Sequence, residues 1–355
     1  MYSIFKNVIF LFIVTGLTVA CNEKSKSTEN WNESPKDKTI FFHIGAPKTG
    51  TTTLQNFLYN NRVILEKKYN LYYPIIDKQG DRIVTNGKFI HDLKLYDSFF
   101  TEIEKTNSDK ILVSEELIFL YKNINLFQQK PLEKYHVKII VYIRSPVEYI
   151  ASLWAEHCKL YKRGDFYVSN SYDGQFDEFM KLDDYQKSLN YILELSQLIG
   201  SDNIIIKPYE PESFLSTPLI EDFMSIFDIP ITKDFNITQN KNPSLNRKHC
   251  DVVTFLKKHS SVFDYTQKQI DEIVSNVGGD ERKVIDTIEN EQIRSICANY
   301  ADITARLSEE FYKGVDLFVK PCTSYIKKDR PSYIPLSASD KNKILDFIKY
   351  HQENK

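Results

Sequence analysis

The stretch His43-Ile-Gly-Ala-Pro-Lys-Thr-Gly-Thr-Thr-Thr-Leu54 decides the fold of this chain. It follows the apolar run at residues 39–44, which predicts a buried strand, and it leads into residues 51–60, whose apolar side chains recur at helical spacing. A loop between a strand and a helix presents backbone N–H groups and the positive end of the helix dipole. The stretch therefore predicts a binding site for a phosphate-like anion.

This loop departs from the phosphate-binding loop of nucleotide kinases. Gly45 and Gly50 have the G-x4-G spacing of that motif, but Thr51 stands where its lysine belongs. The lysine of the present loop, Lys48, precedes the second glycine. A small-molecule or nucleotide kinase is therefore only an alternative reading of the motif.

Short apolar runs alternate with helical patterns along most of the chain. Strands are predicted at residues 110–114, 137–143 and 203–207, and helices at residues 147–161, 183–199 and 219–227. This alternation predicts an α/β fold with a central parallel sheet flanked by helices. After Asn242 we expect a helical part, with helices near residues 250–258, 267–276 and 291–313, a loop at residues 323–338 and a short last helix.

A second motif follows the strand that is predicted at residues 137–143. Arg144 comes directly after this strand, and Ser152 lies eight residues later, two turns into a helix that Pro146 opens. A guanidinium group binds phosphate oxygens in a bidentate manner, and a hydroxyl two helical turns away can converge on the same phosphate. The pair therefore predicts a second phosphate site.

Together the two motifs resemble those of the sulfotransferases that use 3′-phosphoadenosine 5′-phosphosulfate (PAPS). Residues 47–52 look like the 5′-phosphosulfate loop of that family, and Arg144 and Ser152 have the spacing of its 3′-phosphate pair. The resemblance covers roughly residues 39–315. It implies a P-loop NTPase-like sulfotransferase fold, PAPS as co-substrate, PAP as product and no metal.

By this resemblance, Lys48 contacts the bridging oxygen of the donor, and the residues that follow it hold the phosphosulfate group. These residues are Thr49, Gly50, Thr51 and Thr52. Many cytosolic members place a tryptophan that stacks on adenine where Thr53 stands here, so another ring must cover the adenine. Tyr209, in the stretch Lys207-Pro-Tyr-Glu210 at the end of a predicted strand, is the candidate.

Weaker similarities concern the acceptor. Residues 153–164, 176–179 and 242–245 resemble stretches of bacterial, carbohydrate-type members. The acceptor that this resemblance implies is a hydroxyl group of a polysaccharide, a glycolipid or another glycoconjugate. We expect His157 and Arg163, which follow the 3′-phosphate motif, to face it.

Sulfuryl transfer also needs a base that takes the proton of the acceptor hydroxyl. Glu115 follows the strand predicted at residues 110–114, at the edge where open α/β sheets build their sites. It also resembles a catalytic-acid position in bacterial and Golgi-type members. We expect Glu115 to be the base, with Glu116 and His91 as the alternatives.

The composition argues against other classes of protein. The 355 residues carry 46 Lys and Arg against 48 Asp and Glu, a net charge of −2, which disfavours a nucleic-acid binder. The five cysteines form neither a CxxC pair nor a cluster with histidines, so we expect no structural zinc site. We predict that these cysteines are buried small hydrophobic residues.

Residues 1–21 differ in kind from the rest of the chain. Lys6 precedes an uncharged stretch of 13 residues, and small residues lead into Cys21, a pattern typical of a secretory signal and similar to a bacterial lipoprotein processing site. An uncleaved membrane anchor is the alternative. The lysines that follow the stretch would keep the next domain cytoplasmic if the segment stays uncleaved, and the supply of PAPS also argues for the cytoplasm.

We therefore predict four parts: a signal, lipoprotein or anchor segment at residues 1–21, a polar tether at 22–38, a sulfotransferase domain at 39–322, and a C-terminal loop with a short helix at 323–355. Membrane association would come through the N-terminus, on a side that the sequence leaves open. A non-catalytic surface lipoprotein with a degenerate sulfotransferase fold is the remaining alternative. The intact Lys48, Arg144 and Ser152 argue against it.

Overall fold

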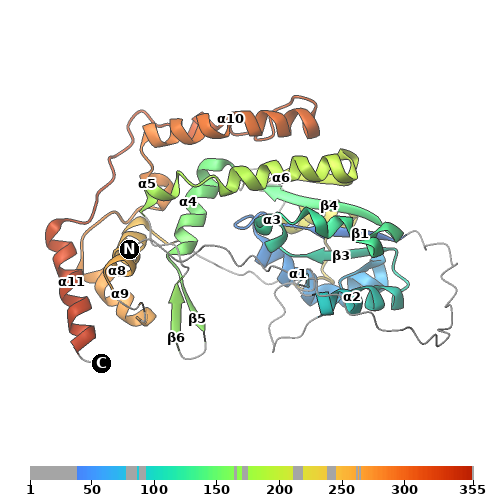
Figure 1. Ribbon diagram of the computed structural model, residues 1–355, viewed down its shortest axis with the longest axis horizontal. Helices are drawn as coiled ribbons and strands as arrows, with labels where there is room; N and C mark the ends of the chain where they lie inside the picture. Colours follow the sequence, from blue (N-terminus) through green and yellow to red (C-terminus); the bar gives the residue numbers. More distant parts are fainter. Residues whose placement is uncertain are drawn as a thin grey trace, which may run out of the picture. The chain divides into compact units, whose positions relative to one another are not determined.

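Five parallel strands form the central sheet of the protein, in the order β2-β3-β1-β4-β7 (Figure 1). Their bounds are β1 Thr39–His43, β2 Leu71–Tyr72, β3 Lys110–Ser114, β4 His136–Ile143 and β7 Ile204–Pro208. The computed structural model describes residues 38–76, 86–87, 93–163, 166–169, 175–210, 219–237, 245–260, 263 and 265–353. Among these residues, the side chains of 93–95, 160–163 and 166–169 are not described.

The sheet is buried on both faces. Ile40 and Phe42 of β1 point into one apolar cluster, and Phe41 points into a second cluster on the opposite face. Successive strand side chains alternate between faces, so a run in which every residue is apolar must be covered twice. This explains the continuous apolar runs at the predicted strands and confirms the predicted α/β class with a parallel sheet between helices.

Helices from different parts of the chain cover the two faces. α1 (Thr51–Tyr69) and α7 (Leu219–Ser225) pack on the face to which Phe41 points. The other face is covered by α2 (Leu93–Lys105), α4 (Pro146–His157) and α6 (Asp184–Ile199). α1 extends beyond the predicted residue 60 and ends at Tyr69. Asn70 caps it, and its left-handed backbone returns its N–H group to the carbonyl oxygens of Glu66 and Leu65.

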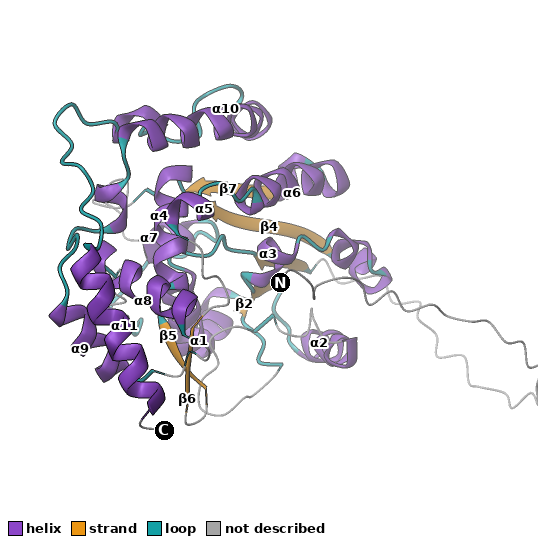
Figure 2. Cartoon of the chain, turned by 60° about the vertical axis from the view of Figure 1, so that its left-hand side comes forward, coloured by secondary structure: helices purple, strands orange, loops and turns teal. Residues whose placement is uncertain are grey.

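The part of the chain after β7 is helical, as predicted (Figure 2). Its long helices are α8 Arg247–His259, α9 Gln267–Asn276, α10 Asn290–Tyr312 and α11 Ala338–Glu353. α10 packs on α4 and α6, whereas α9 and α11 pack on α8. The last helix has 16 residues and buries Ile344 and Ile348, so it is longer than the short helix that the sequence suggested. Short helices are α3 Leu117–Tyr121 and α5 Phe176–Phe179.

A two-stranded hairpin replaces the end of one predicted helix. The helix expected over residues 147–161 ends at His157, and β5 (Leu160–Arg163) then pairs with β6 (Phe166–Ser169) in an antiparallel manner. The two strands are rich in aromatic and β-branched residues, and such residues favour a strand when a partner strand is near. The prediction of a helix as far as residue 161 was therefore wrong for its last residues.

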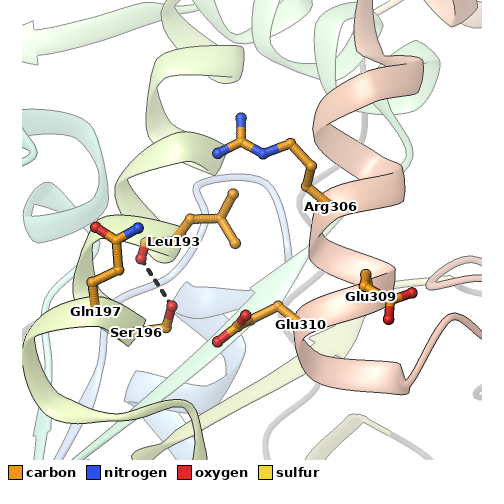
Figure 3. A pocket seen from close by; sticks show the side chains of 6 residues that line it. All are labelled: Leu193, Ser196, Gln197, Arg306, Glu309 and Glu310. Carbon is orange, nitrogen blue, oxygen red and sulfur yellow. Dashed lines mark hydrogen bonds between the residues drawn. The ribbon is translucent and has the colours of Figure 1, made fainter.

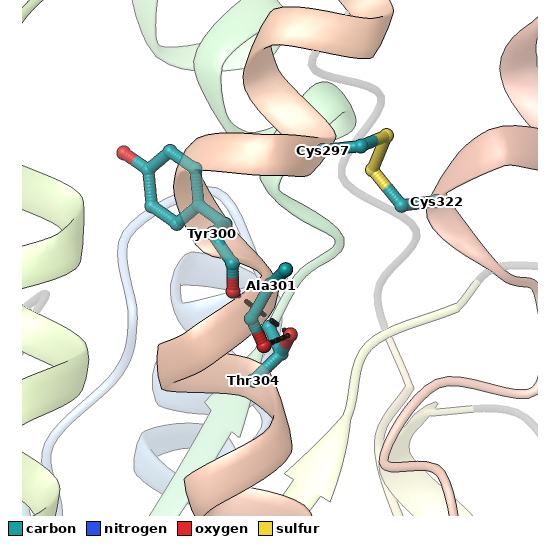
Figure 4. Close-up of a disulfide and its surroundings, with 5 residues drawn as sticks. All are labelled: Cys297, Tyr300, Ala301, Thr304 and Cys322. Carbon is teal, nitrogen blue, oxygen red and sulfur yellow. Dashed lines mark hydrogen bonds between the residues drawn. A yellow bond between two sulfur atoms is a disulfide. The ribbon is translucent and has the colours of Figure 1, made fainter.

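The cysteines follow the prediction only in part. Cys158 and Cys250 are buried free thiols that lie close together, because the Sγ of Cys158 is 3.7 Å from the carbonyl oxygen of Cys250. Cys297 of α10, in contrast, forms a disulfide with Cys322, across 25 residues of sequence (Figure 4). The prediction that all cysteines are buried hydrophobic residues was wrong for this pair, because the fold brings the following turn back onto α10. Cys21 lies outside the described residues.

The N-terminal predictions concern residues that are mostly outside the described part. Residues 1–21 and nearly all of the predicted tether lie outside the described residues. Lys38 is described and is buried, and its ammonium group donates to the carbonyl oxygens of Ile103 and Thr106 at 2.7 and 2.8 Å. None of the described helices is long and apolar enough to cross a membrane.

Candidate functional site

The loop between β1 and α1 is tied to the neighbouring strand β4. Ala46 donates to the carbonyl oxygen of Tyr142 at 2.7 Å, and Tyr142 donates back to that of Gly45 at 2.8 Å. The hydroxyl of Thr49 donates to the carbonyl oxygen of Ala46 at 2.5 Å and closes the loop on itself. These bonds fix the loop at the carboxyl edge of the sheet.

The loop presents the open N-terminus of α1. Gly50 precedes this helix with a φ of 80° and supplies no side chain to cap the first N–H groups, so these groups remain available to an anion. A Cβ at Gly50 would lie 2.3 Å from a methyl group of Leu219, so glycine is required here for space as well as for conformation. Thr51 is buried at the start of the helix, whereas Thr52 is exposed beside it.

Lys48 is held by a carboxylate that the sequence analysis did not single out. Its Nζ lies 2.6 Å from the Oε2 of Glu156, in the last turn of α4, and the Nζ of Lys159 lies 2.9 Å from the same oxygen. The side chains of Lys48 and Glu156 are 22% and 20% exposed. Lys48 also has a φ of 67°, a left-handed conformation that non-glycine residues seldom adopt. The backbone of the loop lysine is therefore in a restricted conformation, and its side chain is paired with Glu156.

Arg144 reaches the same loop from the end of β4. Its Nη1 donates to the carbonyl oxygen of Lys48 at 3.3 Å, and its Nε donates to Glu148 at 2.8 Å. The hydroxyl of Tyr185 donates to the carbonyl oxygen of Arg144 at 2.6 Å. The guanidinium is thus oriented toward the loop. Ser152 follows on α4, and its side chain forms no hydrogen bond with the other described residues.

Tyr209 lies where the two predicted motifs meet. Its backbone N–H group bonds to the carbonyl oxygen of Ile143 at 2.6 Å, directly after β7. The guanidinium carbon of Arg144 lies 5.5 Å from the centre of its ring, and the ring also borders Gly50. Burial raises the pKa of the Tyr209 hydroxyl. The structure therefore brings together three residues that the sequence assigned to one ligand.

The two adjacent glutamates after β3 have different surroundings. Glu116 accepts a hydrogen bond from the hydroxyl of Thr51 at 2.6 Å, and burial raises the pKa of its carboxyl group. The charge of Lys48 lowers this pKa and the charge of Glu156 raises it, and both effects are smaller than that of burial. Glu115 is only 2% exposed, and its carboxylate accepts the backbone N–H of Leu117 at 3.0 Å. Glu116 is thus the glutamate at the loop, although Glu115 was the first choice from the sequence.

Other candidates lie elsewhere or outside the described part. His91 belongs to residues that the structure does not describe, and the side chain of Arg163 is likewise not described. His157, at the end of α4, stacks edge-on against Phe179, and burial lowers its pKa. Glu156 was missed in the sequence, although its position four residues after Ser152 places it on the same helix face.

Two cavities lie away from these residues. One of about 280 Å³ lies between α6 and α10 and is lined by Leu193, Ser196, Gln197, Arg306, Glu309 and Glu310 (Figure 3). Another, of about 380 Å³, lies beside α5 and α8 around the buried pair Arg247 and Asp251. Neither cavity contains a predicted site residue. Within the described ranges, no group of His, Cys, Asp or Glu side chains could hold a metal ion.

Comparisons with known proteins give structural likeness only. No protein-family model matches the chain, and no curated protein sequence matches it. A sulfotransferase from Alicyclobacillus acidocaldarius is similar at 14% identity and a TM-score of 0.39, over 77% of this chain and 95% of that one. The sulfotransferase domain of the Synechococcus PCC 7002 olefin synthase is similar at 11% identity and a TM-score of 0.37, over 71% and 98%. Mouse sulfotransferase SULT7A1 complexed with PAP is similar at 12% identity and a TM-score of 0.41, over 79% and 87%.

Proposed function

We propose that this protein is a sulfotransferase that moves a sulfuryl group from PAPS to a hydroxyl acceptor. One observation carries the proposal: the hydrogen bond from Arg144 to the carbonyl oxygen of Lys48 joins the two anion-binding motifs into one site. The open N-terminus of α1 lies in the same place. A ligand with phosphate-like groups at two positions suits this arrangement better than a ligand with one.

The residues of the site divide the donor between them. Lys48 and the helix start formed by Thr49, Gly50, Thr51 and Thr52 would hold the 5′-phosphosulfate, since backbone N–H groups and an ammonium favour an anion. Arg144 and Ser152 would hold the 3′-phosphate. Tyr209, which borders both Gly50 and Arg144, would pack on the adenine ring and replace the tryptophan that is absent at Thr53.

The chemistry needs a cation and a base. In the transfer, the acceptor oxygen attacks sulfur in line as the bond between sulfur and the bridging phosphate oxygen breaks. Lys48 would stabilise the negative charge that forms on that leaving oxygen. We assign the acceptor proton to Glu116, because its carboxylate lies at the loop and burial raises its pKa, which makes it a stronger base. Glu115 and His91 stay alternatives for this step.

For the acceptor we propose a carbohydrate or glycoconjugate hydroxyl, which rests on the sequence resemblance alone. We also propose that residues 1–21 attach the protein to a membrane. The disulfide between Cys297 and Cys322 favours a compartment that maintains disulfides, whereas the cytoplasmic supply of PAPS favours the other side of the membrane. Protease access to the protein in intact cells, compared with opened cells, distinguishes the two sides.

The same disulfide favours a second candidate, a surface lipoprotein that keeps this fold without catalysis. Binding assays separate the candidates at the first step. We expect PAP to raise the melting temperature of the protein far more than ATP at equal concentration, because a ligand that binds only the folded state stabilises it. Equal shifts with both nucleotides would favour the kinase alternative, and no shift with PAP would refute the proposal.

A further inference from the structure

The contact between Lys48 and Glu156 carries an inference that goes beyond the proposed function. The ammonium of Lys48 lies 2.6 Å from the carboxylate of Glu156, and both side chains are about four-fifths buried. A charge pair in such a place is stronger than a pair in open solvent, because water screens it less. In this state the ammonium of Lys48 is therefore paired with a carboxylate of the protein itself.

The backbone of Lys48 is fixed by its neighbours, so only its side chain can change partner. Its φ of 67° and the hydrogen bond from Arg144 to its carbonyl oxygen fix the main chain, while Thr49 closes the loop on Ala46. For Lys48 to serve an incoming anion, its side chain must exchange the carboxylate of Glu156 for that anion. The two partners compete for one cation.

Lys159 makes this exchange feasible. Its Nζ lies 2.9 Å from the same oxygen of Glu156 and is 17% exposed at the side chain. When Lys48 leaves, Glu156 keeps a cationic partner, so no partly buried carboxylate is left uncompensated. The cost of releasing Lys48 is therefore lower than the cost of breaking an isolated buried pair, which is large.

We propose that Glu156 is a positioning residue that holds Lys48 until the anionic donor replaces it. This inference rests on the proposed function for the identity of the donor, but the hold on Lys48 is a property of the unliganded protein. It assigns to Glu156 an indirect effect on donor affinity, which acts through the side chain of Lys48. Glu116 accepts a hydrogen bond from Thr51 at the start of α1, and the charge of Lys48 also acts on it.

The first test measures the affinity for PAP by titration calorimetry. We expect Glu156→Gln to bind PAP roughly 3- to 10-fold more tightly than the wild type, because Lys48 no longer has to leave a carboxylate. In a Lys48→Ala background the same substitution should change the affinity by much less, which a double-mutant cycle detects. The exposed Glu194→Gln, on the neighbouring α6, is the matched control for loss of one negative charge.

An equal gain in both backgrounds would mean that Glu156 only repels the anion, and it would overturn the proposal. Unchanged affinity in Glu156→Gln would do the same. A thermal unfolding curve for each variant shows whether it remains folded.

The second test needs no ligand and separates this inference from the proposed function. Amine-reactive labelling followed by mass spectrometry reports how available Lys48 is in the free protein. We expect Lys48 to react several-fold faster in Glu156→Gln than in the wild type, while an exposed lysine such as Lys349 reacts at the same rate in both. The wild-type protein could fail to bind PAP while Lys48 still reacts faster in Glu156→Gln. This result would support the hold of Glu156 on Lys48 and would refute the proposed function. Equal labelling of Lys48 in both proteins would overturn the hold, whatever the protein binds.

Discussion

The guanidinium of Arg144 donates a hydrogen bond to the carbonyl oxygen of Lys48 at 3.3 Å, across 96 residues of sequence. Arg144 directly follows β4 and Lys48 lies in the loop after β1, and these two strands are adjacent and parallel. Parallel neighbours end at the same edge of a sheet, so the topology places both residues at one site.

Arg144→Ala should weaken PAP binding by about 2–3 kcal/mol, or roughly 30- to 150-fold, because a charged partner of a phosphate is lost. Titration calorimetry measures the change. Arg306→Ala, an exposed arginine on α10, is the control and should bind PAP as the wild type does. A wild-type affinity in Arg144→Ala would remove this residue from the site.

Substitutions of the two glutamates test the assignment of the base. Glu116→Gln keeps the shape of the side chain but removes a proton acceptor, so it should lower kcat about 10²- to 10⁴-fold with little change in PAP affinity. Glu115→Gln, on the adjacent residue, is the matched control. Loss of activity in Glu115→Gln or in His91→Ala, with Glu116→Gln active, would transfer the role to that residue.

His43 should make the stability of the protein dependent on pH. The residue is buried, its Nδ1 lies 2.8 Å from the hydroxyl of Ser114, and burial lowers its pKa to about 3. The unfolded chain binds a proton at this residue below about pH 6.5, whereas the folded chain does not until about pH 3, so stability is lost as the pH falls through this window.

Between pH 7 and pH 5 the contribution of His43 amounts to about 2 kcal/mol. Urea unfolding at both pH values, for the wild type and for His43→Gln, measures it, because the difference in pH dependence between the two proteins isolates this residue. Equal pH dependence in both proteins would show that His43 is not held neutral by the fold.

The disulfide should stabilise the protein because it links two residues that are 25 positions apart in the sequence. Closing a loop of this length in the unfolded chain predicts about 3.5 kcal/mol. The double substitution Cys297→Ser with Cys322→Ser should therefore lower the free energy of unfolding by about that amount, measured in urea without reductant. Cys250→Ser, at a buried free thiol, controls for substitution of a cysteine outside the disulfide. An unchanged free energy in the double variant would show that the crosslink does not stabilise the folded state.

The sequence was informative where one local pattern determines one element. The strands β1, β3, β4 and β7 could be predicted because strands that are buried on both faces have continuous apolar runs. The order of Gly45, Lys48 and Gly50 predicted the anion-binding loop. Contacts between residues that are distant in the sequence could not be predicted. The ion pair of Lys48 with Glu156 forms because α4 packs beside the loop, and the sequence did not predict this packing.

Two further differences have the same cause. Cys297 and Cys322 pair because the chain returns onto α10 after a turn, and their spacing alone does not indicate this. The hairpin forms because two short segments, β5 and β6, pair in an antiparallel manner. The helical pattern before the hairpin had predicted that the helix would continue into β5. In each case a contact between segments determined the outcome, and a single sequence does not encode that contact in its periodicity.

The most direct test of the account is the transfer of a radiolabelled sulfuryl group from PAPS to a panel of polysaccharide, glycolipid, phenol and peptide acceptors. We expect the wild type to label at least one hydroxyl acceptor, and Lys48→Ala to lower the rate about 10²- to 10³-fold, because the leaving oxygen loses its cation. PAP affinity in Lys48→Ala should fall much less, since Arg144 and the start of α1 remain. Equal rates in the wild type and Lys48→Ala, or no labelled product from a wild-type protein that binds PAP, would contradict the account.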